Sequence, residues 1–199
     1  MLKIGITGGI GSGKTIVCDI FKNLNIPIFI ADIQAKLLLI DDKIKENLLQ
    51  LLGDDILTND QIDNEKLAKL IFNNKTILQT VNSIIHPAVA LKFTDWINWH
   101  GTAPYVIIES AILFETKINF NLHYMINVTA PLELRISRIA SRNNFDKDSI
   151  MARINNQITE EERCKRADAI IYNDESQLLI PQILELHNKF IQENLKITN

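Results

Sequence analysis

One short stretch near the start of the chain combines residue types that bind a polyphosphate. Residues 8–15 read GGIGSGKT and fill every fixed position of the pattern G-x-x-x-x-G-K-[ST]. Glycines let successive backbone N–H groups turn towards one anion, and the lysine after them adds a positive charge. This stretch, called here the phosphate loop, therefore predicts binding of a nucleoside triphosphate. The alternative interpretation is a glycine-rich turn that only joins a strand to a helix.

Each part of the phosphate loop has an expected role at the triphosphate. A helix that begins near Gly13 directs the positive end of its dipole at the phosphates. Lys14 is expected to reach the β- and γ-phosphates, and the Thr15 hydroxyl to bind Mg²⁺. The N–H of Ile16 is expected to approach the α-phosphate. The residues of this stretch expected to bind ATP are Gly9, Gly11, Ser12, Gly13, Lys14, Thr15 and Ile16.

Two acidic residues end predicted strands and are candidates for acid–base chemistry. Asp32 ends the apolar run at 26–32, at the edge of the sheet where the phosphate loop is also expected. A carboxylate there orients an acceptor hydroxyl and accepts its proton late in phosphoryl transfer. Glu109, in the run at 105–110, is a candidate second acid near Mg²⁺ or the acceptor. For both residues the alternative is a helix cap.

Three arginines share one face of a predicted helix. Arg135, Arg138 and Arg142 stand at i, i+3 and i+7, within about 60° of one another at 3.6 residues per turn. Arginine forks match phosphate oxygens and stabilise the charge that develops in a transition state. We expect Arg138 and Arg142 to act in catalysis, and Arg135, nearer the preceding strand, to be the more structural of the three. A solvated basic face is the alternative.

Short apolar runs predict the β-sheet that positions these residues. The runs are continuous rather than alternating, which is typical of parallel strands covered by helices on both faces. The sequence therefore indicates an α/β fold with a parallel five-stranded sheet, in which a helix over 15–24 follows the phosphate loop. The five predicted strands cover residues 2–7, 26–32, 105–110, 124–130 and 168–173.

Helical patterns fill the interval of about seventy residues between the second and third predicted strands. Pro87 is expected to break this region and to start a new helix. We interpret residues 35–100 as a helical insertion that binds the acceptor. The predicted helices cover 42–53, 64–74, 76–85 and 87–100, after a short one over 33–39.

A second helical attachment follows the fourth predicted strand. Residues 132–158 are expected to form a helix, a polar turn and a second helix. Their place near the edge of the sheet predicts a lid, at about 135–158, that folds over a bound ligand. Residues 1–34 and 101–199 then form the kinase-like core, with the lid inside it.

The composition is that of an ordinary globular protein and does not indicate a nucleic-acid partner. The 199 residues are 46% hydrophobic and 23% charged, and the formal net charge is −3. Cys18 and Cys164 show neither a disulfide framework nor a metal-ligand spacing, so two reduced thiols are expected. The sequence shows no signal-peptide core and no apolar run of roughly 20 residues. We therefore expect a cytoplasmic protein without membrane contact, as a monomer or small homo-oligomer.

The motifs of other nucleotide-binding classes are missing from the sequence. A regulatory GTPase needs D-x-x-G and N-K-x-D, but neither Gly53 nor Gly101 has an aspartate three residues before it. The glycine pair of an ABC-type signature is missing too. A small-molecule kinase is the leading hypothesis. The alternatives are a kinase for another nucleotide-like hydroxyl or monophosphate, and a non-catalytic ATP-binding switch that signals through its lid.

Several blocks together resemble the dephospho-coenzyme A (dephospho-CoA) kinase family over nearly the whole chain. In chain order they are IGITGGIGSGKT, FIADIQAK, NSIIHPAV, ILFE, RISRIASR, RINNQ and RADAIIYND. The ADIQAK and IIHPAV blocks separate this family from other nucleotide kinases. The resemblance implies a P-loop NTPase-type core with a helical acceptor domain and a lid. It also implies transfer of the ATP γ-phosphate to the ribose 3′-hydroxyl of dephospho-CoA, the last step of CoA biosynthesis.

The resemblance also implies roles for individual residues. Asp32 stands where the family has the carboxylate that faces the acceptor ribose. His86 and Pro87 match the His-Pro pair of the family's acceptor domain, although by themselves they read as a helix break. Asn173 lies where similar kinases contact the adenine. Together with Lys36, the residues expected at the acceptor are Asp32, His86 and Glu109.

The chain departs from the family pattern at four positions. Ile30 replaces the first acid of an Asp-Ala-Asp, so only Asp32 is left to act as the base. Lys36 stands where arginine is common and keeps the charge without the planar fork. Asn64 replaces another arginine, and Ala111 replaces a proline. None of these changes removes a group that the chemistry requires.

Overall fold

A computed structural model describes residues 1–116, 120–142, 150–151 and 154–198 of the chain. The chain forms two compact units. One unit consists of Met1–Ile30 together with Ile97–Asn199, and the other of Ala31–Trp96. The first unit carries the phosphate loop, and the second carries the helices interpreted above as an acceptor-binding insertion. The acceptor-binding role and the lid role stay predictions.

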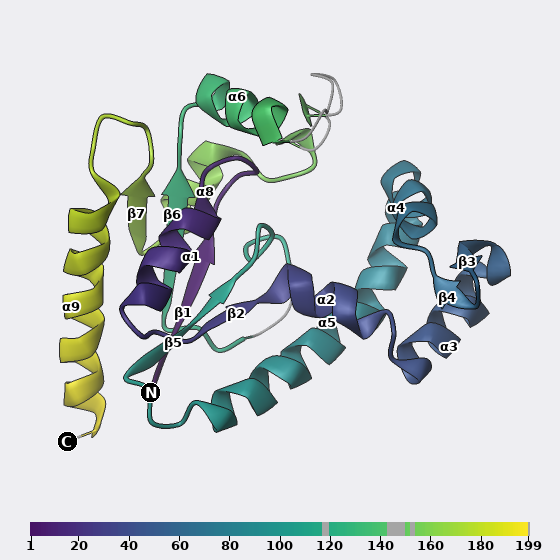
Figure 1. The fold of residues 1–199 in the computed structure, drawn as a ribbon, viewed down its shortest axis with the longest axis horizontal. Coiled ribbons are helices and arrows are strands. Elements are labelled where there is room, and N and C mark those ends of the chain that lie inside the picture. Colours follow the sequence, from purple (N-terminus) through teal and green to yellow (C-terminus); the bar gives the residue numbers. More distant parts are fainter. Residues whose placement is uncertain (117–119, 143–149, 152–153, 199) are drawn as a thin grey trace. The chain divides into compact units, whose positions relative to one another are not determined.

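In the part of the chain that the structure describes, five parallel strands form the sheet of the first unit (Figure 1). Their order is β2-β5-β1-β6-β7, so that β1 lies in the middle with β5 and β6 on either side. This finding confirms the predicted parallel sheet. The strands are β1 (Leu2–Thr7), β2 (Ile28–Ile30), β5 (Tyr105–Glu109), β6 (Tyr124–Thr129) and β7 (Ala169–Tyr172).

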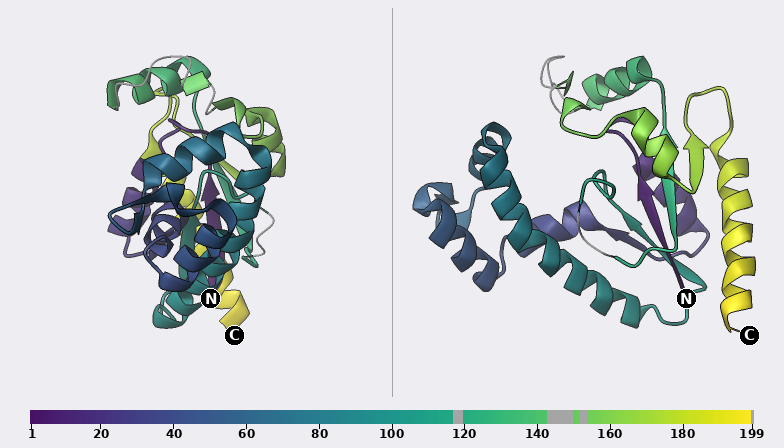
Figure 2. Two further views of the ribbon diagram at one scale, coloured as in Figure 1. Left: turned by 90° about the vertical axis from the view of Figure 1, so that its right-hand side faces the viewer. Right: turned by 180° about the vertical axis from the view of Figure 1, so that it is seen from behind.

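Helices cover both faces of this sheet. On one face α1 (Lys14–Asn23) contacts α9 (Leu179–Thr198), which runs alongside β7 (Figures 1 and 2). On the other face α8 (Glu160–Arg166) contacts β6. The remaining helix of this unit with described bounds, α6 (Leu132–Arg142), begins shortly after β6 ends. The first helix predicted within 132–158 is therefore present, and the second lies mostly outside the described residues.

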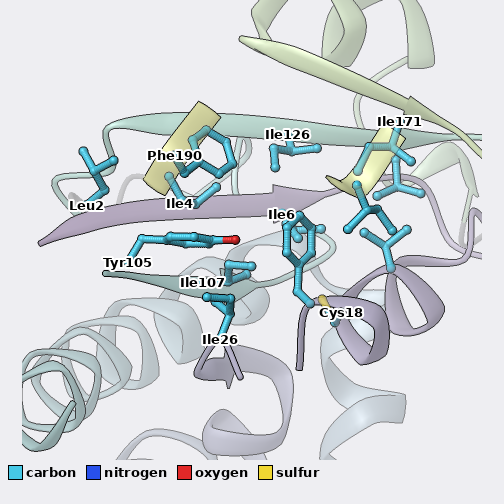
Figure 3. Packing of buried hydrophobic residues seen from close by; sticks show 14 residues of the cluster. Leu2, Ile4, Ile6, Cys18, Ile26, Tyr105, Ile107, Ile126, Ile171 and Phe190 are labelled. Carbon is cyan, nitrogen blue, oxygen red and sulfur yellow. The ribbon is translucent and has the colours of Figure 1, made fainter. Parts of the chain in front are cut away.

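The hydrophobic core of the first unit lies between the sheet, α1 and α9 (Figure 3). Tyr105 is its aromatic centre, because its ring packs edge-on against Phe21 and Phe190 at centroid distances of 6.5 and 5.4 Å. All residues of β5 are buried, which explains why this strand reads as an unbroken apolar run. Other buried members include Leu2, Ile4, Ile6, Val17, Ile107, Ile126, Val128, Ile171 and Ile183.

The second unit is built from helices and one small hairpin. Aspartates begin two of its helices: Asp41 accepts a hydrogen bond from Ile44 N at 3.2 Å, and Asp63 accepts from Glu65 N at 2.9 Å. The hairpin turns at Asn59 and Asp60, both with positive φ. The elements are α2 (Ala31–Leu38), α3 (Asp42–Leu52), η1 (Asp54–Ile56), β3 (Leu57–Thr58), β4 (Gln61–Ile62), α4 (Asn64–Asn73) and α5 (Lys75–Trp99).

The prediction that Pro87 starts a new helix is wrong, because α5 runs through it without a break. Val81, Ile85, Val89 and Phe93 are buried at intervals of four residues on both sides of the proline. This apolar stripe stabilises one continuous helix and outweighs the hydrogen bond that Pro87 cannot donate. The hairpin, α8 and α9 were not predicted either. Within the described residues, none of the helices combines the length and the apolar character that crossing a bilayer requires.

We predict that Pro87→Ala raises the free energy of unfolding by about 1–2 kcal/mol, because alanine restores the helical hydrogen bond to the carbonyl of Ser83. The side chain of Pro87 is exposed, so little packing is lost. Urea unfolding followed by circular dichroism measures the shift. Lys92→Ala, at another exposed position of α5, is the control and should leave the midpoint nearly unchanged. A lower midpoint for Pro87→Ala would contradict the prediction.

Candidate active site

The phosphate loop connects the end of β1 directly to the first residue of α1, Lys14. Gly13 is the N-cap of α1, in a left-handed conformation with φ 96°. Because glycine has no side chain, nothing at the cap position competes with an incoming anion for the N–H groups of the first turn. The helix dipole favours negative charge at the same place. The loop therefore has the local geometry of an anion site.

Side chains from distant segments pack directly on the backbone of the phosphate loop. A Cβ atom at Gly13 would collide with Nδ2 of Asn173, and one at Gly9 would collide with the guanidinium of Arg135. The loop closes on itself where Ser12 N donates to Gly9 O at 3.0 Å. These two glycines are therefore required by packing, in addition to the conformational freedom that the motif predicts.

The Lys14 ammonium lies between the loop and the end of β5. Its Nζ donates to the carbonyl oxygen of Gly8 at 2.9 Å and lies 4.0 Å from Oε1 of Glu109. Both side chains are largely shielded, with 11% and 12% exposed, so their charges interact more strongly than they would in water. Glu109 reaches this position because β5 pairs with β1, with Glu109 opposite Ile6. Glu109, the predicted second acid, thus lies next to Lys14 of the phosphate loop.

The thiol of Cys18 lies in the core behind the loop. Burial raises the pKa of Cys18, and the negative charge of Glu109 raises it further. The thiol is therefore neutral at physiological pH and unsuited to act as a nucleophile. Cys18 and Cys164 are both free cysteines, as the sequence predicts.

The oxygen atoms around Lys14 are of the kind that Mg²⁺ prefers. Thr15 is exposed in the first turn of α1, and Glu109 ends the neighbouring strand. Among the described residues no group of three or more His, Cys, Asp and Glu side chains is arranged to hold a metal ion. Kinases, however, bind Mg²⁺ chiefly through substrate phosphates with one or two protein oxygens. Thr15 and Glu109 fit such a site.

The three arginines of α6 differ in their surroundings. Arg135 is 3% exposed, and its Nε donates to the carbonyl oxygen of Ile10 at 2.9 Å. This contact agrees with the structural role expected for it. Arg138 instead forms an ion pair with Glu175 at 3.3 Å, in the segment after β7. The side chain of Arg142 lies outside the described part of the chain.

Asn173 holds the phosphate loop from the end of β7. Its Nδ2 donates to the carbonyl oxygen of Ser12 at 2.8 Å, and its backbone N donates to Thr129 O, also at 2.8 Å. The side chain is buried, so this amide hydrogen bond is shielded from water. The adenine contact expected for Asn173 stays a prediction, and the structure gives the residue a second task in supporting the loop.

A protein-family model described as dephospho-CoA kinase matches residues 2–178 of the chain. The chain belongs to the dephospho-CoA kinase family. It is therefore an ATP-using kinase that phosphorylates dephospho-CoA to CoA, the last step of CoA biosynthesis. The family resemblance carried by the sequence blocks is thereby confirmed.

Curated relatives and solved structures extend this family match over almost the whole chain. The dephospho-CoA kinase of Bacteroides fragilis strain YCH46 is 39% identical over 186 residues, which is 93% of this chain and 91% of the relative. That of Porphyromonas gingivalis strain W83 is 35% identical over 190 residues, covering 94% and 93%. TT1252 from Thermus thermophilus has a TM-score of 0.82 at 30% identity, covering 98% and 97% of the two chains. Dephospho-CoA kinase from Campylobacter jejuni has a TM-score of 0.63 at 27% identity, covering 98% and 94%.

Asp32, the expected base of this dephospho-CoA kinase family member, lies in the second unit. The prediction that Asp32 ends a strand is wrong, because β2 stops at Ile30 and Asp32 is the second residue of α2. Ile30 pairs with Glu109, the last residue of β5, so beyond Ile30 the edge strand has no neighbour left to pair with. The chain turns directly into a helix at Ala31. Asp32 is exposed in its first turn.

Two other residues expected at the acceptor lie on helices of the same unit. Lys36 is exposed in the last turn of α2, and His86 is partly buried in the middle of α5. Burial lowers the pKa of His86 below its ordinary value, so its imidazole is neutral at pH 7. His86 is therefore suited to hydrogen bonding with an acceptor rather than to charge pairing.

Sequence reasoning missed the side chains that support the phosphate loop from behind. Gln157 accepts a hydrogen bond from Ile10 N at 3.0 Å, and Glu160 forms ion pairs with Arg135 and Arg163. Gln157 closes the block RINNQ, which the family resemblance picks out, but no spacing rule links it to the loop. Glu160 and Arg163 look like an ordinary helical i, i+3 pair in the sequence, and only the contact of Glu160 with Arg135 links them to the loop.

We predict that Lys14→Ala lowers kcat/KM for ATP about 100-fold, because a shielded charge that is expected to contact the phosphates is lost. The apparent affinity for ATP and the turnover number should fall together. Steady-state ADP release measures both. Lys22→Ala, which removes an exposed lysine from the last turn of the same helix, should leave the kinetics unchanged. Unaltered kinetics in Lys14→Ala would contradict the role of the phosphate loop.

Proposed function

We propose that the chain transfers the γ-phosphate of ATP to the ribose 3′-hydroxyl of dephospho-CoA, with ATP on the phosphate loop and Asp32 at the acceptor. The observation that carries the proposal is the start of α1, where the N-cap Gly13 offers no side chain to the first N–H groups and Lys14 follows directly. The chain belongs to the dephospho-CoA kinase family. Backbone N–H groups and the helix dipole favour the triphosphate there. The proposal adds the acceptor atom and the residue roles to the family's activity.

At the ATP side, the proposed work is positioning and charge stabilisation. The N–H groups of the loop bind the phosphates, and Lys14 exchanges its contact with the Gly8 carbonyl for one with the β- and γ-phosphates. Arg138 and Arg142 stabilise the charge that develops on the transferred phosphoryl group. Asn173 lies against the adenine while it holds Ser12. The proposed ATP-binding residues are thus Gly9, Gly11, Ser12, Gly13, Lys14, Thr15, Ile16 and Asn173.

At the acceptor side, Asp32 is proposed to orient the 3′-hydroxyl and to accept its proton. The transition state of phosphoryl transfer is loose, so the proton leaves late and a carboxylate of ordinary basicity is sufficient. The position of Asp32 in the chain supports this role, because only Ala31 separates it from the end of β2. Lys36, His86 and Glu109 are proposed to bind the rest of the acceptor. Ile30 replaces the first acid of the family's Asp-Ala-Asp, so Asp32 alone is proposed as the base.

Mg²⁺ is the proposed cofactor, held by the Thr15 hydroxyl and by the phosphates of ATP. When bound, the ion neutralises charge on the β- and γ-phosphate oxygens. Glu109 is proposed to lie beside it, on the side of Lys14. We further propose a cytoplasmic monomer or small homo-oligomer, since the two free thiols fit a reducing compartment.

We predict that Asp32→Asn lowers kcat at least 100-fold, because the amide cannot accept the hydroxyl proton. Binding of ATP should stay nearly intact, since the expected ATP ligands do not include Asp32. Isothermal titration with ATP and a coupled ADP-release assay measure the two effects. Asp42→Asn makes the same change in the first turn of α3 and should leave both unchanged. Near-normal turnover in Asp32→Asn would remove the residue from this role.

We predict that ATP consumption depends on the acceptor and is strongest with dephospho-CoA. A coupled ADP-release assay would compare dephospho-CoA with AMP, CMP and adenosine, and phosphorus NMR would show whether the product carries a 3′-phosphate. Turnover with AMP or CMP alone would indicate a kinase for another nucleotide. ATP binding without turnover on any acceptor would instead favour a non-catalytic switch. Removal of Mg²⁺ with EDTA should abolish turnover.

A further inference from the structure

The peptide groups on either side of Ile10 are both held by side chains from the segment after β6. The N–H of Ile10 donates to Oε1 of Gln157 at 3.0 Å, and its carbonyl oxygen accepts from Nε of Arg135 at 2.9 Å. These partners are 147 and 125 positions away in the sequence, so the contacts are tertiary and not part of the loop's own turn. Gln157 is itself fixed, because its Nε2 donates to the carbonyl oxygen of Ala111 at 3.1 Å.

Ile10 is the point at which the phosphate loop would change conformation most easily without these contacts. It stands between Gly9 and Gly11, and glycine backbones rotate at low cost. A rotation there would redirect the neighbouring N–H groups away from the phosphates. Ile10 is hydrogen-bonded at both its N–H and its carbonyl. Rotation of the peptide group on either side of it therefore breaks a hydrogen bond. The two side chains therefore restrict the freedom that the glycines create.

The Arg135 guanidinium is in turn held by a charged cluster in which Arg163 is buried and Glu160 is partly exposed. Glu160 Oε2 lies 3.4 Å from Nη1 of Arg135 and 2.8 Å from Nη2 of Arg163, and Glu160 Oε1 accepts from Nδ2 of Asn127 at 2.8 Å. Burial raises the pKa of Glu160, but the hydrogen bonds from Arg163 and Asn127 outweigh it and lower the pKa overall. Glu160 is therefore ionised, and two guanidinium groups against one carboxylate leave positive charge behind the loop.

Burial of the Arg135 guanidinium lowers the stability of the fold, so stability by itself does not explain this residue. Its Nη2 is buried without a hydrogen-bond partner among the described residues. Such a group carries a desolvation penalty, and a residue without a charge would avoid it. The guanidinium packs on Gly9 and donates to Ile10, so its contacts with the loop are the gain that offsets this penalty.

We propose that Arg135 and Gln157 are positioning residues, which fix Ile10 so that the phosphate loop keeps the conformation that binds the β- and γ-phosphates. This inference rests on the proposed ATP site, but it assigns the two residues no contact with substrate. They act through the backbone at Ile10. The acceptor is bound by other residues, so its affinity does not depend on them.

The test measures binding of inorganic tripolyphosphate with Mg²⁺, a probe that contains the phosphates but no adenosine. Arg135→Lys keeps the charge but not the planar fork, and Gln157→Ala removes a side chain that is only partly buried. Each variant should weaken tripolyphosphate binding roughly tenfold in isothermal titration, as expected for one hydrogen bond. KM for ATP should rise by a similar factor, and KM for dephospho-CoA should stay unchanged.

Arg166→Lys is the matched control, because the Arg166 guanidinium also donates to a backbone carbonyl, that of Phe114 at 3.1 Å, but its contacts are with Phe114 and Glu162 instead of the phosphate loop. It should lower the unfolding midpoint while tripolyphosphate affinity stays within twofold of the unsubstituted chain. If Arg135→Lys and Gln157→Ala also lower the unfolding midpoint but leave tripolyphosphate affinity unchanged, the two residues have only a structural role and the inference is overturned. If Arg135→Lys fails to fold, Gln157→Ala alone decides.

The double variant separates a shared action from two independent ones. If both side chains fix Ile10, losing the first already frees it, so the combined loss should be smaller than the product of the single losses. A combined loss equal to the product would contradict the shared action. A failure of the unsubstituted chain itself to bind tripolyphosphate would overturn the proposed ATP site, which is a different result from insensitivity of the variants.

Discussion

A loop of nearly bare backbone must keep its N–H groups directed at one point, although glycine gives it more conformational freedom than any other residue. In this chain the constraint is met from outside the loop. Asn173 holds Ser12, and Arg135 and Gln157 hold Ile10. Within the loop, Lys14 adds a hydrogen bond to the carbonyl of Gly8. The anion site is therefore a property of tertiary packing as much as of the eight-residue motif.

The order of the strands explains how such distant segments reach one loop. Because β1 is central, the segments that leave β5 and β6 start beside the phosphate loop. From β5 come Glu109, which reaches Lys14, and Ala111, which fixes Gln157. After β6 the chain enters α6, where Arg135 lies. The apolar face that packs on α1 and α9 fixes the strands on which these segments depend.

The sequence was informative where the signal is local. The strands are continuous apolar runs, and the phosphate loop is a contiguous motif, so both could be recognised without knowledge of the partners. The supporting side chains could not, because Gln157 and Arg135 acquire their meaning only from a backbone more than a hundred positions away. The prediction at Pro87 was wrong for a similar reason, because the buried apolar stripe of α5 outweighs the tendency of proline to interrupt a helix. The start of α2 at Ala31 depends on where β5 ends, which no local pattern reveals.

The contacts of Lys14 also bear on how tightly a nucleotide is held. Its ammonium has the Gly8 carbonyl and the Glu109 carboxylate close by. At the proposed ATP site, binding of ATP is then an exchange of partners by Lys14, and the measured affinity reports only the difference between the old contacts and the new ones. Because the charge of Lys14 is partly balanced by Glu109, its attraction for the phosphates is weaker, and ADP should be released more readily after each turnover.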